Sequence, residues 1–266
     1  MTLVAILIGT MTAGIGSVWL AALLSFGMLA RYTQHMLSLA AGALLATAFM
    51  HLLPEAFESR VGADSLFATL LVGLVFFFLL DKAELWHHGH EHHATQSAGD
   101  AHDSAHGHGH VNDHHAHRSG GWTVLAGDSV HAFGDGILIA SAFIADLRLG
   151  LVATLAVLVH EVPHHMGDLI VLRQSSNNRR VALVKVSMAG AVTALGGIVG
   201  YALVDQLIDY LPYFLIVASS SFVYVALADL IPQLQKRVGP GETMAQIVWL
   251  AIGIGLVTLI GGLMHG

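Results

Sequence analysis

Eight ionisable side chains lie within two apolar stretches of this 266-residue chain. They are Asp128, His131 and Asp135 in the first stretch, and His160, Glu161, His164, His165 and Asp168 in the second. Ionisable groups at membrane depth cost free energy and usually serve a function. Imidazole nitrogen and carboxylate oxygen are ligands that suit Zn²⁺ and other first-row divalent ions. The cluster therefore predicts a metal site.

The spacing of these residues places them on shared helix faces. Positions i and i+4 lie one turn apart on the same face, so His131 pairs with Asp135, and His160 with His164. Only residues 146–148 separate the two stretches, which predicts antiparallel neighbouring helices. At a rise of about 1.5 Å per residue, His131 should level with His164, and Asp135 with His160. Two His/carboxylate pairs are therefore expected to face each other near the bilayer midplane.

The same residues contain HEVPH (160–164), which fits the HExxH zinc signature of metalloproteases, with Glu161 as general base. Intramembrane metalloproteases take their third ligand from an Asp-Gly pair in a later span, whereas Asp135-Gly136 precedes the histidines here. Pro163 is expected to break the helix between the two histidines and to free a carbonyl for water or a cation. Broken helices near the midplane are typical of transport sites. We therefore favour transport over proteolysis.

Composition indicates that lipid surrounds most of the chain. Hydrophobic residues make up 55% and charged residues 11%, whereas a soluble domain carries roughly a quarter charged residues. A helix needs about 20 apolar residues to cross the hydrocarbon core. The sequence predicts an all-α membrane protein with eight such helices: Thr2–Ala30, Leu37–Phe57, Leu66–Trp86, Trp122–Ala145, Leu149–Leu172, Val181–Val204, Leu211–Leu234 and Met244–His265.

The absence of cysteine excludes disulfides and thiolate ligands. The net charge of −7, without a basic run, makes nucleic acid an unexpected partner. The first apolar run is too long for a secretory signal, so we expect it to be a retained span.

Positive charge predicts the orientation. With both termini outside, the inner loops and helix ends hold nine of the eleven Lys and Arg residues: Arg31, Lys82, Arg118, Arg173, Arg179, Arg180, Lys185, Lys236 and Arg237. The outer side holds only Arg60 and Arg148. We therefore expect a multi-pass protein of the cell membrane with both termini outside.

An internal similarity predicts a repeat. Aligning Pro54 with Pro232 matches "AFMHLLPEAF" to "ALADLIPQL" and pairs His51 with Asp229. The predicted topology puts one motif at the outer face and the other at the inner face, as an inverted repeat requires. We therefore expect helices 1–3 and 6–8 to be related, around helices 4 and 5, in a 3+2+3 arrangement. The corresponding segments are 1–86, 87–119, 120–174 and 175–266.

The segment 87–119 is rich in histidine. Twelve of the nineteen histidines lie between His87 and His117, mixed with Gly, Ala, Ser and Asp. Such a composition cannot bury a core, so disorder is expected. The predicted topology places this segment in the cytoplasm, where clustered histidine would serve as an acceptor or sensor for arriving metal; a tolerated low-complexity linker is the alternative.

"HAFGDG" (131–136) and "HEVPHH" (160–165) resemble the paired signatures of the ZIP (Zrt/Irt-like) divalent-metal transporters, in the branch that reads HNFTDG and HEVPHE. "AFMHLLPEAF" and "SFVYVALADLIPQL" are similar to that family's second and seventh helices. The resemblance covers nearly the whole chain. It implies metal transport and an elevator-like motion of the fourth and fifth helices.

The resemblance also implies a division of the ligands. The main metal site would take His131, Asp135, His160 and His164. A neighbouring site would use Glu161 and share His164. This chain departs from the family pattern at three positions: Ala132 replaces Asn, His165 replaces Glu, and Thr47 replaces an Asp. The second site is therefore weakened, or rebuilt with Asp128, His165 or Asp168, and His51 is a further auxiliary candidate.

The resulting hypothesis is a transporter, not an enzyme, that takes a divalent cation into the cytoplasm between helices 4 and 5. Zn²⁺ is the favoured substrate because no thiolate is available, and Fe²⁺, Mn²⁺, Co²⁺ and Cd²⁺ stay open. A cation exporter and a membrane metal sensor are the alternatives, although such exporters use six spans. The expected partners are the metal ion and the lipid bilayer, with a homodimer as a possible assembly.

Overall fold

The computed structural model describes residues 2–25, 33–92, 120–176, 178–234 and 239–263. These residues are almost entirely helical, and no strand occurs among them. Eight of the helical segments are long and apolar enough to cross a membrane. The predicted all-α membrane protein with eight spans is therefore confirmed, while the 3+2+3 arrangement stays a prediction.

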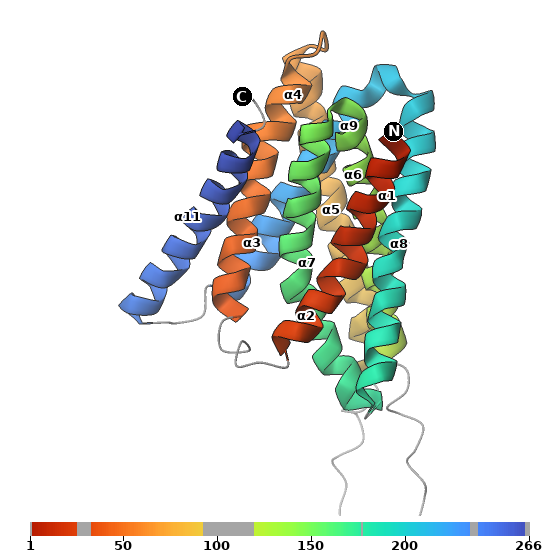
Figure 1. Cartoon of the computed structure of the whole chain (residues 1–266), viewed down its shortest axis with the longest axis vertical. Helices are drawn as coiled ribbons and strands as arrows, with labels where there is room; N and C mark the ends of the chain where they lie inside the picture. The colour runs from red at the N-terminus through yellow and green to blue at the C-terminus, as the bar shows by residue number, and fades with distance from the viewer. Residues whose placement is uncertain (1, 26–32, 93–119, 177, 235–238, 264–266) are drawn as a thin grey trace, which may run out of the picture.

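Several spans consist of more than one helical element. The first three spans are formed by α1 (Thr2–Met11), η1 (Thr12–Gly16) and α2 (Ser17–Ser25), then α3 (Thr33–Thr47), η3 (Ala48–Leu52) and α4 (Leu53–Phe57), then α5 (Ala63–His92). The fourth, fifth and sixth spans are α6 (Gly120–Ala145), α7 (Leu147–Ser176) and α8 (Arg179–Gln206). The seventh span is a run of four elements, η5 (Ile208–Tyr210), α9 (Leu211–Tyr224), η6 (Val225–Leu230) and α10 (Ile231–Leu234). The eighth span is α11 (Pro240–Leu263). The first helix begins, and the last helix ends, at the same end of the bundle (Figure 1), as an even number of spans requires.

The histidine-rich segment begins inside a helix. Because α5 continues to His92, residues 87–92 are helical, and the predicted disorder is wrong for them. The remaining residues of that segment, 93–119, lie outside the described part of the chain.

Asp146 makes the tight turn between α6 and α7. Its Oδ1 accepts hydrogen bonds from the backbone N–H groups of Arg148 at 2.8 Å and Leu149 at 3.4 Å. This N-cap satisfies two of the amides that a new helix leaves unpaired. The chain therefore reverses within one residue, and α6 and α7 pack side by side as antiparallel neighbours.

The two prolines that the sequence aligns lie in matching backbone structures. The N–H of Leu53 donates to the carbonyl of Ala48, and the N–H of Ile231 donates to that of Ala226. Both are five-residue π-type bonds, one position before Pro54 and Pro232. A π-bulge is one way for a helix to absorb a missing N–H. This shared feature supports the predicted repeat, whose inverted orientation stays a prediction.

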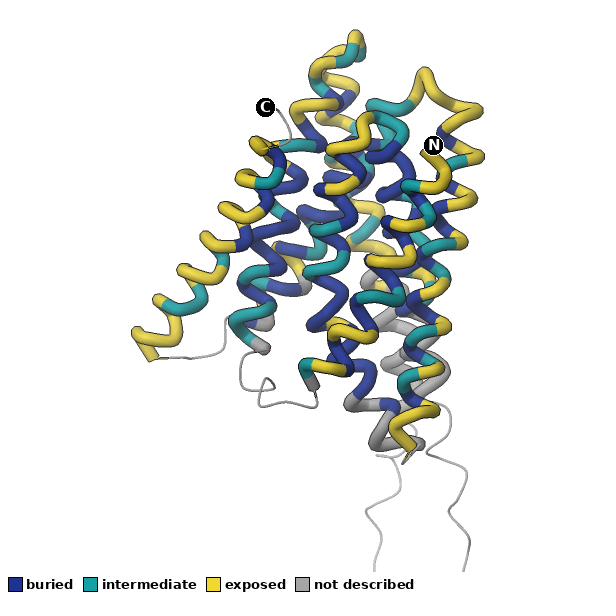
Figure 2. The backbone as a smooth tube through the Cα atoms, in the orientation of Figure 1, coloured by how far each residue is buried: buried dark blue, intermediate teal, exposed yellow. Residues whose placement is uncertain are grey.

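Pro163 behaves differently. The structure shows α7 as one continuous α-helix from Leu147 to Ser176 that contains Pro163. The expected break between the two histidines of HEVPH is therefore wrong. Packing keeps the helix continuous, because α7 lies against α2, α3, α6 and α8 and is buried along much of its length in the middle of the bundle (Figure 2).

Two helices lie at the outside of the bundle. The α5 helix packs on α9, and α11 packs on α3. Both expose large apolar side chains, such as Phe76 on α5 and Leu259 on α11, and the outer side of α11 is exposed along its length (Figure 2). Lipid is the expected neighbour of such faces.

The α6 helix is held tightly against α8 by glycine. A methyl group at Gly136 would overlap the carbonyl oxygen of Thr193, and one at Gly196 would overlap that of Phe133. By contrast, nothing lies within 4 Å of a methyl group placed at Gly134. The face of α6 that contains Gly136 therefore fixes the helix in the bundle, and the face toward α7 carries the ionisable side chains.

Candidate metal centre

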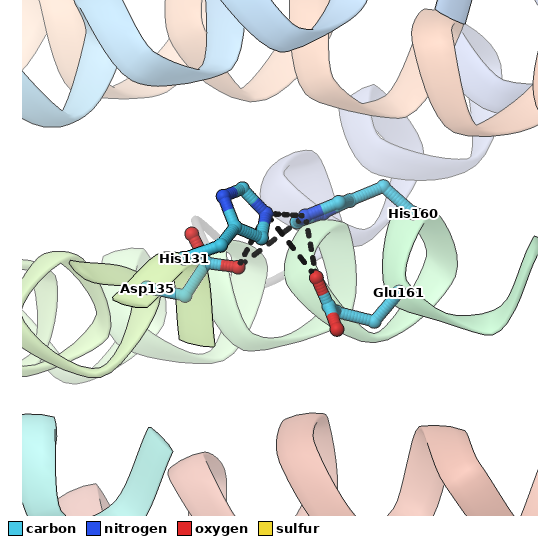
Figure 3. A group of neighbouring side chains, drawn as sticks. All are labelled: His131, Asp135, His160 and Glu161. Carbon is cyan, nitrogen blue, oxygen red and sulfur yellow. Dashed lines mark hydrogen bonds and ion pairs between the residues drawn. The ribbon is translucent and has the colours of Figure 1, made fainter. Parts of the chain in front are cut away.

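Four side chains from α6 and α7 converge in the bundle (Figure 3). His131 and Asp135 come from α6, and His160 and Glu161 come from α7. Each offers one potential ligand atom, and the four atoms lie within 4.8 Å of one another. Asp135, His160 and Glu161 are each only 2% exposed, so little water reaches these groups.

The separations of the four atoms match a tetrahedral coordination shell. His160 Nε2 lies 3.4 Å from His131 Nε2, 3.3 Å from Asp135 Oδ2 and 3.2 Å from Glu161 Oε1. His131 Nε2 lies 3.3 Å from Glu161 Oε1 and 3.8 Å from Asp135 Oδ2. Ligand bonds of about 2.0–2.1 Å in a tetrahedron put the ligand atoms about 3.3 Å apart. A Zn²⁺ ion fits among them with small adjustments.

A backbone contact orients His160. Its Nδ1 lies 3.1 Å from the carbonyl oxygen of Ala156, one turn earlier in α7. A carbonyl can only accept, so Nδ1 carries the proton and donates it. In the neutral ring, Nε2 then presents its lone pair to the other three groups. Metal-binding histidines are commonly held in this way.

The carboxylates of Asp135 and Glu161 have oxygens without a hydrogen-bond donor as partner in the described part of the chain. Asp135 Oδ2 and Glu161 Oε1 are buried and accept no hydrogen bond from the described residues. While the neighbouring imidazoles present lone pairs to them, two buried carboxylates are strongly unfavourable. A divalent cation would neutralise both charges and satisfy the imidazole nitrogens at the same time, so the arrangement suits a dication better than it suits an ordinary polar network.

The other predicted residues form two further groups. Asp128, Glu161 and His165 form one, and Asp128, His164 and Asp168 form the other. The sequence had placed His164 in the main site and Glu161 in the neighbouring site. In the structure Glu161 joins the main group, while His164 Nδ1 lies near Asp128 and Asp168.

His164 nevertheless stays close to the main group. Its ring stacks on that of His131, with 5.9 Å between the ring centroids and 22° between the planes. His131 thus lies beside His164, and His160 beside Asp135, as the antiparallel arrangement predicts, but the ring of His131 lies equally close to that of His160, with 5.7 Å between the centroids.

The remaining candidate, His51, and two of the three departures, Ala132 and Thr47, add no ligand atom to the main group. His51 belongs to none of the three groups found among the described residues, and its ring lies where Gly261 of α11 leaves room for it. Ala132 is buried and offers no ligand atom. The hydroxyl of Thr47 donates to the carbonyl of Ala43 at 2.9 Å and so caps its own helix turn.

One contact of the cluster could not be predicted from the sequence. Ser17 of α2 lies 2.9 Å from His165 Nδ1, across 148 residues of sequence. A lone serine in an apolar first span carries no signal that it would touch the ligand cluster. Only the packing of α2 against α7 creates the contact.

Comparison with known proteins gives a consistent result. A family model described as "ZIP Zinc transporter" matches residues 1–261. "Zinc transporter ZIP13" of Mus musculus is 27% identical over 256 residues, which cover 85% of this chain and 69% of that protein. "Zinc transporter ZIP4" of Homo sapiens is 34% identical over 141 residues, which cover 53% of this chain and 21% of that protein.

A third relative, "Zinc transporter foi" of Drosophila melanogaster, is 31% identical over 140 residues, covering 52% of this chain and 20% of that protein. The chain therefore matches about a fifth of the fly and human relatives, and about two thirds of the mouse one.

Proposed function

This chain belongs to the ZIP zinc transporter family, and from that membership we propose that it transports Zn²⁺ across a membrane through the centre between α6 and α7. The observation that carries the proposal is the near-tetrahedral group of His131, Asp135, His160 and Glu161, whose ligand atoms lie 3.2 to 3.8 Å apart along five of six edges. The ion would exchange its waters for these four ligands.

Charge favours reversible binding at this centre. Two carboxylates balance the two positive charges of Zn²⁺, and the two imidazoles contribute as neutral ligands. All four are oxygen or nitrogen ligands, and thiolates, which hold zinc in many structural sites, are absent from the sequence. The set suits an ion that must be bound and then released. His164, stacked beside His131, would receive the ion as it moves.

Proteolysis is the weaker explanation of HEVPH. The α7 helix is continuous through Pro163, so a broken helix no longer counts against a protease. However, Glu161 Oε1 lies within 3.3 Å of both histidine nitrogens and occupies one of the four ligand positions. A general base instead holds a water between itself and the metal. We therefore assign Glu161 as a ligand, and the chain as a transporter and not an enzyme.

We further propose the direction and topology that positive charge predicts. The nine cationic residues on one side and two on the other support both termini outside, the histidine-rich segment in the cytoplasm of a cell-membrane protein, and uptake toward that segment. We also propose that the chain forms a homodimer. The exposed apolar faces of α5 and α11 could contact a second copy of the chain as well as lipid.

Uptake into liposomes tests the function. The purified chain should carry Zn²⁺ into vesicles faster than Fe²⁺, Mn²⁺, Co²⁺ or Cd²⁺ at equal concentration. His160→Ala should reduce Zn²⁺ uptake at least 100-fold, since it removes the nitrogen that contacts the other three ligands. His164→Ala should reduce uptake less, by about tenfold.

His35→Ala is the matched control, because His35 lies outside all three ligand groups and packs edge-on against Trp249. Binding of Zn²⁺ without movement would instead identify a metal sensor. Wild-type uptake by His160→Ala would exclude the proposed centre.

A further inference from the structure

The rotation of α7 about its own axis decides which of its side chains complete the centre. Figure 3 shows His160 and Glu161 reaching the centre from this helix. Around an α-helix, Glu161 lies about 100° from His160, whereas His164 lies about 40° from it on the same side. Turning α7 by about 30° would therefore replace the pair His160/Glu161 by the pair His160/His164.

His164 lies close enough to take the place of Glu161. Its ring stacks on that of His131, with 5.9 Å between the centroids, and its side chain is 41% exposed. Its Nδ1 lies 3.8 Å from Asp128 Oδ1 and 3.7 Å from Asp168 Oδ2, and both distances are too long for a hydrogen bond. None of these contacts fixes His164 outside the centre, so the rotation of α7 must be held elsewhere.

A hydrogen bond between α7 and α2 is placed to hold it. His165 follows Glu161 by one turn on the same face, with 3.1 Å between His165 Nε2 and Glu161 Oε2. Its other nitrogen, Nδ1, lies 2.9 Å from Ser17 Oγ of α2, and both residues are completely buried. Val18 and Met166, the next residues on the two helices, belong to one buried apolar cluster. Breaking the bond in such surroundings would leave two polar atoms without a partner.

Ser17 is itself fixed by the backbone of the first span. Its hydroxyl donates to the carbonyl of Gly14 at 2.7 Å, so its oxygen accepts from His165 Nδ1–H. Gly14 lies directly against α8, because a methyl group at Gly14 would overlap the carbonyl oxygen of Gly190. Close backbone contact through glycine leaves these two spans little freedom to shift. Ser17 therefore gives His165 a fixed point that belongs to neither α6 nor α7.

We propose that Ser17 is a positioning residue, which fixes the rotation of α7 through His165 and so selects Glu161 over His164 as the fourth ligand of the centre. The inference rests on the proposed function for the identity of the ion. The hydrogen bond holds the His165 edge of α7 against α2, and Glu161, one turn earlier, stays directed at the centre. Without the bond, α7 can turn and His164 competes for the same position.

The selected ligand determines which ions the centre prefers. With Glu161, the set contains two imidazoles and two carboxylates. With His164 in its place, the set would contain three imidazoles and one carboxylate. Imidazole suits Zn²⁺, whereas carboxylate also suits harder ions such as Mn²⁺. Loss of the Ser17 contact should therefore make the centre discriminate more strongly against Mn²⁺.

Competition between Mn²⁺ and Zn²⁺ in the full chain in lipid nanodiscs tests the proposal. Zinc at the centre is the zinc retained beyond that of a matched chain with His131→Ala/His160→Ala, so that zinc on the histidine-rich segment cancels. In Ser17→Ala, the Mn²⁺ concentration that displaces half of this zinc should rise about tenfold. Ser38→Ala is the matched control and should change nothing, because Ser38 is equally buried and its hydroxyl donates to Gln34 within α3.

The dependence of zinc binding on Glu161 gives a readout that a merely structural role would not move. In the otherwise wild-type chain, Glu161→Gln should weaken zinc binding at the centre about 100-fold. In the Ser17→Ala chain, the same substitution should weaken it no more than about tenfold, because His164 takes over the position. Adding His164→Ala to the Ser17→Ala chain should restore the full cost of Glu161→Gln.

A second variant removes the same hydrogen bond from the other side. His165→Leu fills a similar volume without a donor and should change the Mn²⁺ competition as Ser17→Ala does. The double variant Ser17→Ala/His165→Leu should go no further than either single variant, since all three lack one and the same contact. Effects that add would show that the two residues act independently, which would contradict the proposal.

Unchanged Mn²⁺ competition in Ser17→Ala, or an equal cost of Glu161→Gln in both chains, overturns the selection of Glu161 by Ser17. These measurements use bound zinc and not transport, so the two proposals can fail separately. If the wild-type chain held Zn²⁺ at the centre and carried none into liposomes, the proposed function would fail, while the bound zinc would still decide the role of Ser17.

Discussion

The two faces of α6 differ in how closely they approach the neighbouring helices. Toward α7, the helix presents His131 and Asp135, whose polar atoms keep distances that leave space for an ion. Toward α8, it presents Gly136, which brings two backbones so close that one methyl group would not fit. The face toward α7 carries side chains that can bind and release an ion, and the face toward α8 fixes the helix in the bundle.

The difference shows how a membrane-embedded helix bundle can hold ionisable side chains in its interior. Helices in a bilayer gain little from the hydrophobic effect against one another, so close backbone approach through small residues supplies much of their association. The tight α6–α8 contact fixes the position of α6, and the buried ligands opposite depend on that position. The following changes separate the two faces.

The largest effect is expected on the polar face. Asp135→Asn keeps the shape of the side chain and removes one of the two charges that balance the ion. Zn²⁺ uptake by reconstituted protein should fall at least 100-fold, with normal insertion and yield. Asp205→Asn, at an exposed position of α8, is the matched control and should transport at the wild-type rate. A fully active Asp135→Asn protein would contradict the ligand assignment.

The glycine face should give an intermediate effect of a different kind. Gly136→Ala forces α6 away from Thr193, so we expect a lower midpoint of thermal unfolding and about tenfold slower uptake. Gly134→Ala on the same helix meets nothing within 4 Å and should be neutral. Size-exclusion chromatography after heating measures the first quantity. Equal stability of the two variants would show that α6 tolerates displacement.

Pro163 should matter less than its position between two ligands suggests. Because α7 is already α-helical through this residue, Pro163→Ala restores a backbone hydrogen bond without moving His160 or His164. Zn²⁺ affinity in nanodiscs should change by no more than about twofold. A tenfold change would show that the helix opens at Pro163 during binding.

The smallest effect is expected far from both faces. Deleting residues 89–112 should leave the initial rate of Zn²⁺ uptake within about twofold, because the three ligand groups found in the described part of the chain consist of α6 and α7 residues alone. The deletion should lower the total zinc bound per chain and alter regulation of the rate. Complete loss of uptake by correctly inserted protein would refute the assignment of this segment as an accessory acceptor.

Much of this architecture could be predicted from sequence because the signals are local. Runs of apolar residues mark the eight spans, and the short connection at Asp146 makes α6 and α7 neighbours. Helix geometry then predicts that His131 lies near His164 and His160 near Asp135, and both contacts are present. The expected break at Pro163 was wrong, because local propensity yields to the packing of α7 against α2, α3, α6 and α8.

The sequence by itself determined which residue types are available as ligands and which helices carry them, since these follow from composition and from the apolar runs, and a fixed rise per residue predicted their depth. It could not determine how far α7 is rotated about its axis. Glu161 and His164 differ by roughly 60° around the helix, and the tertiary structure alone decides that Glu161 faces His131 and Asp135. The contact of Ser17 with His165 is of the same kind, because only the packing of distant helices brings the two together.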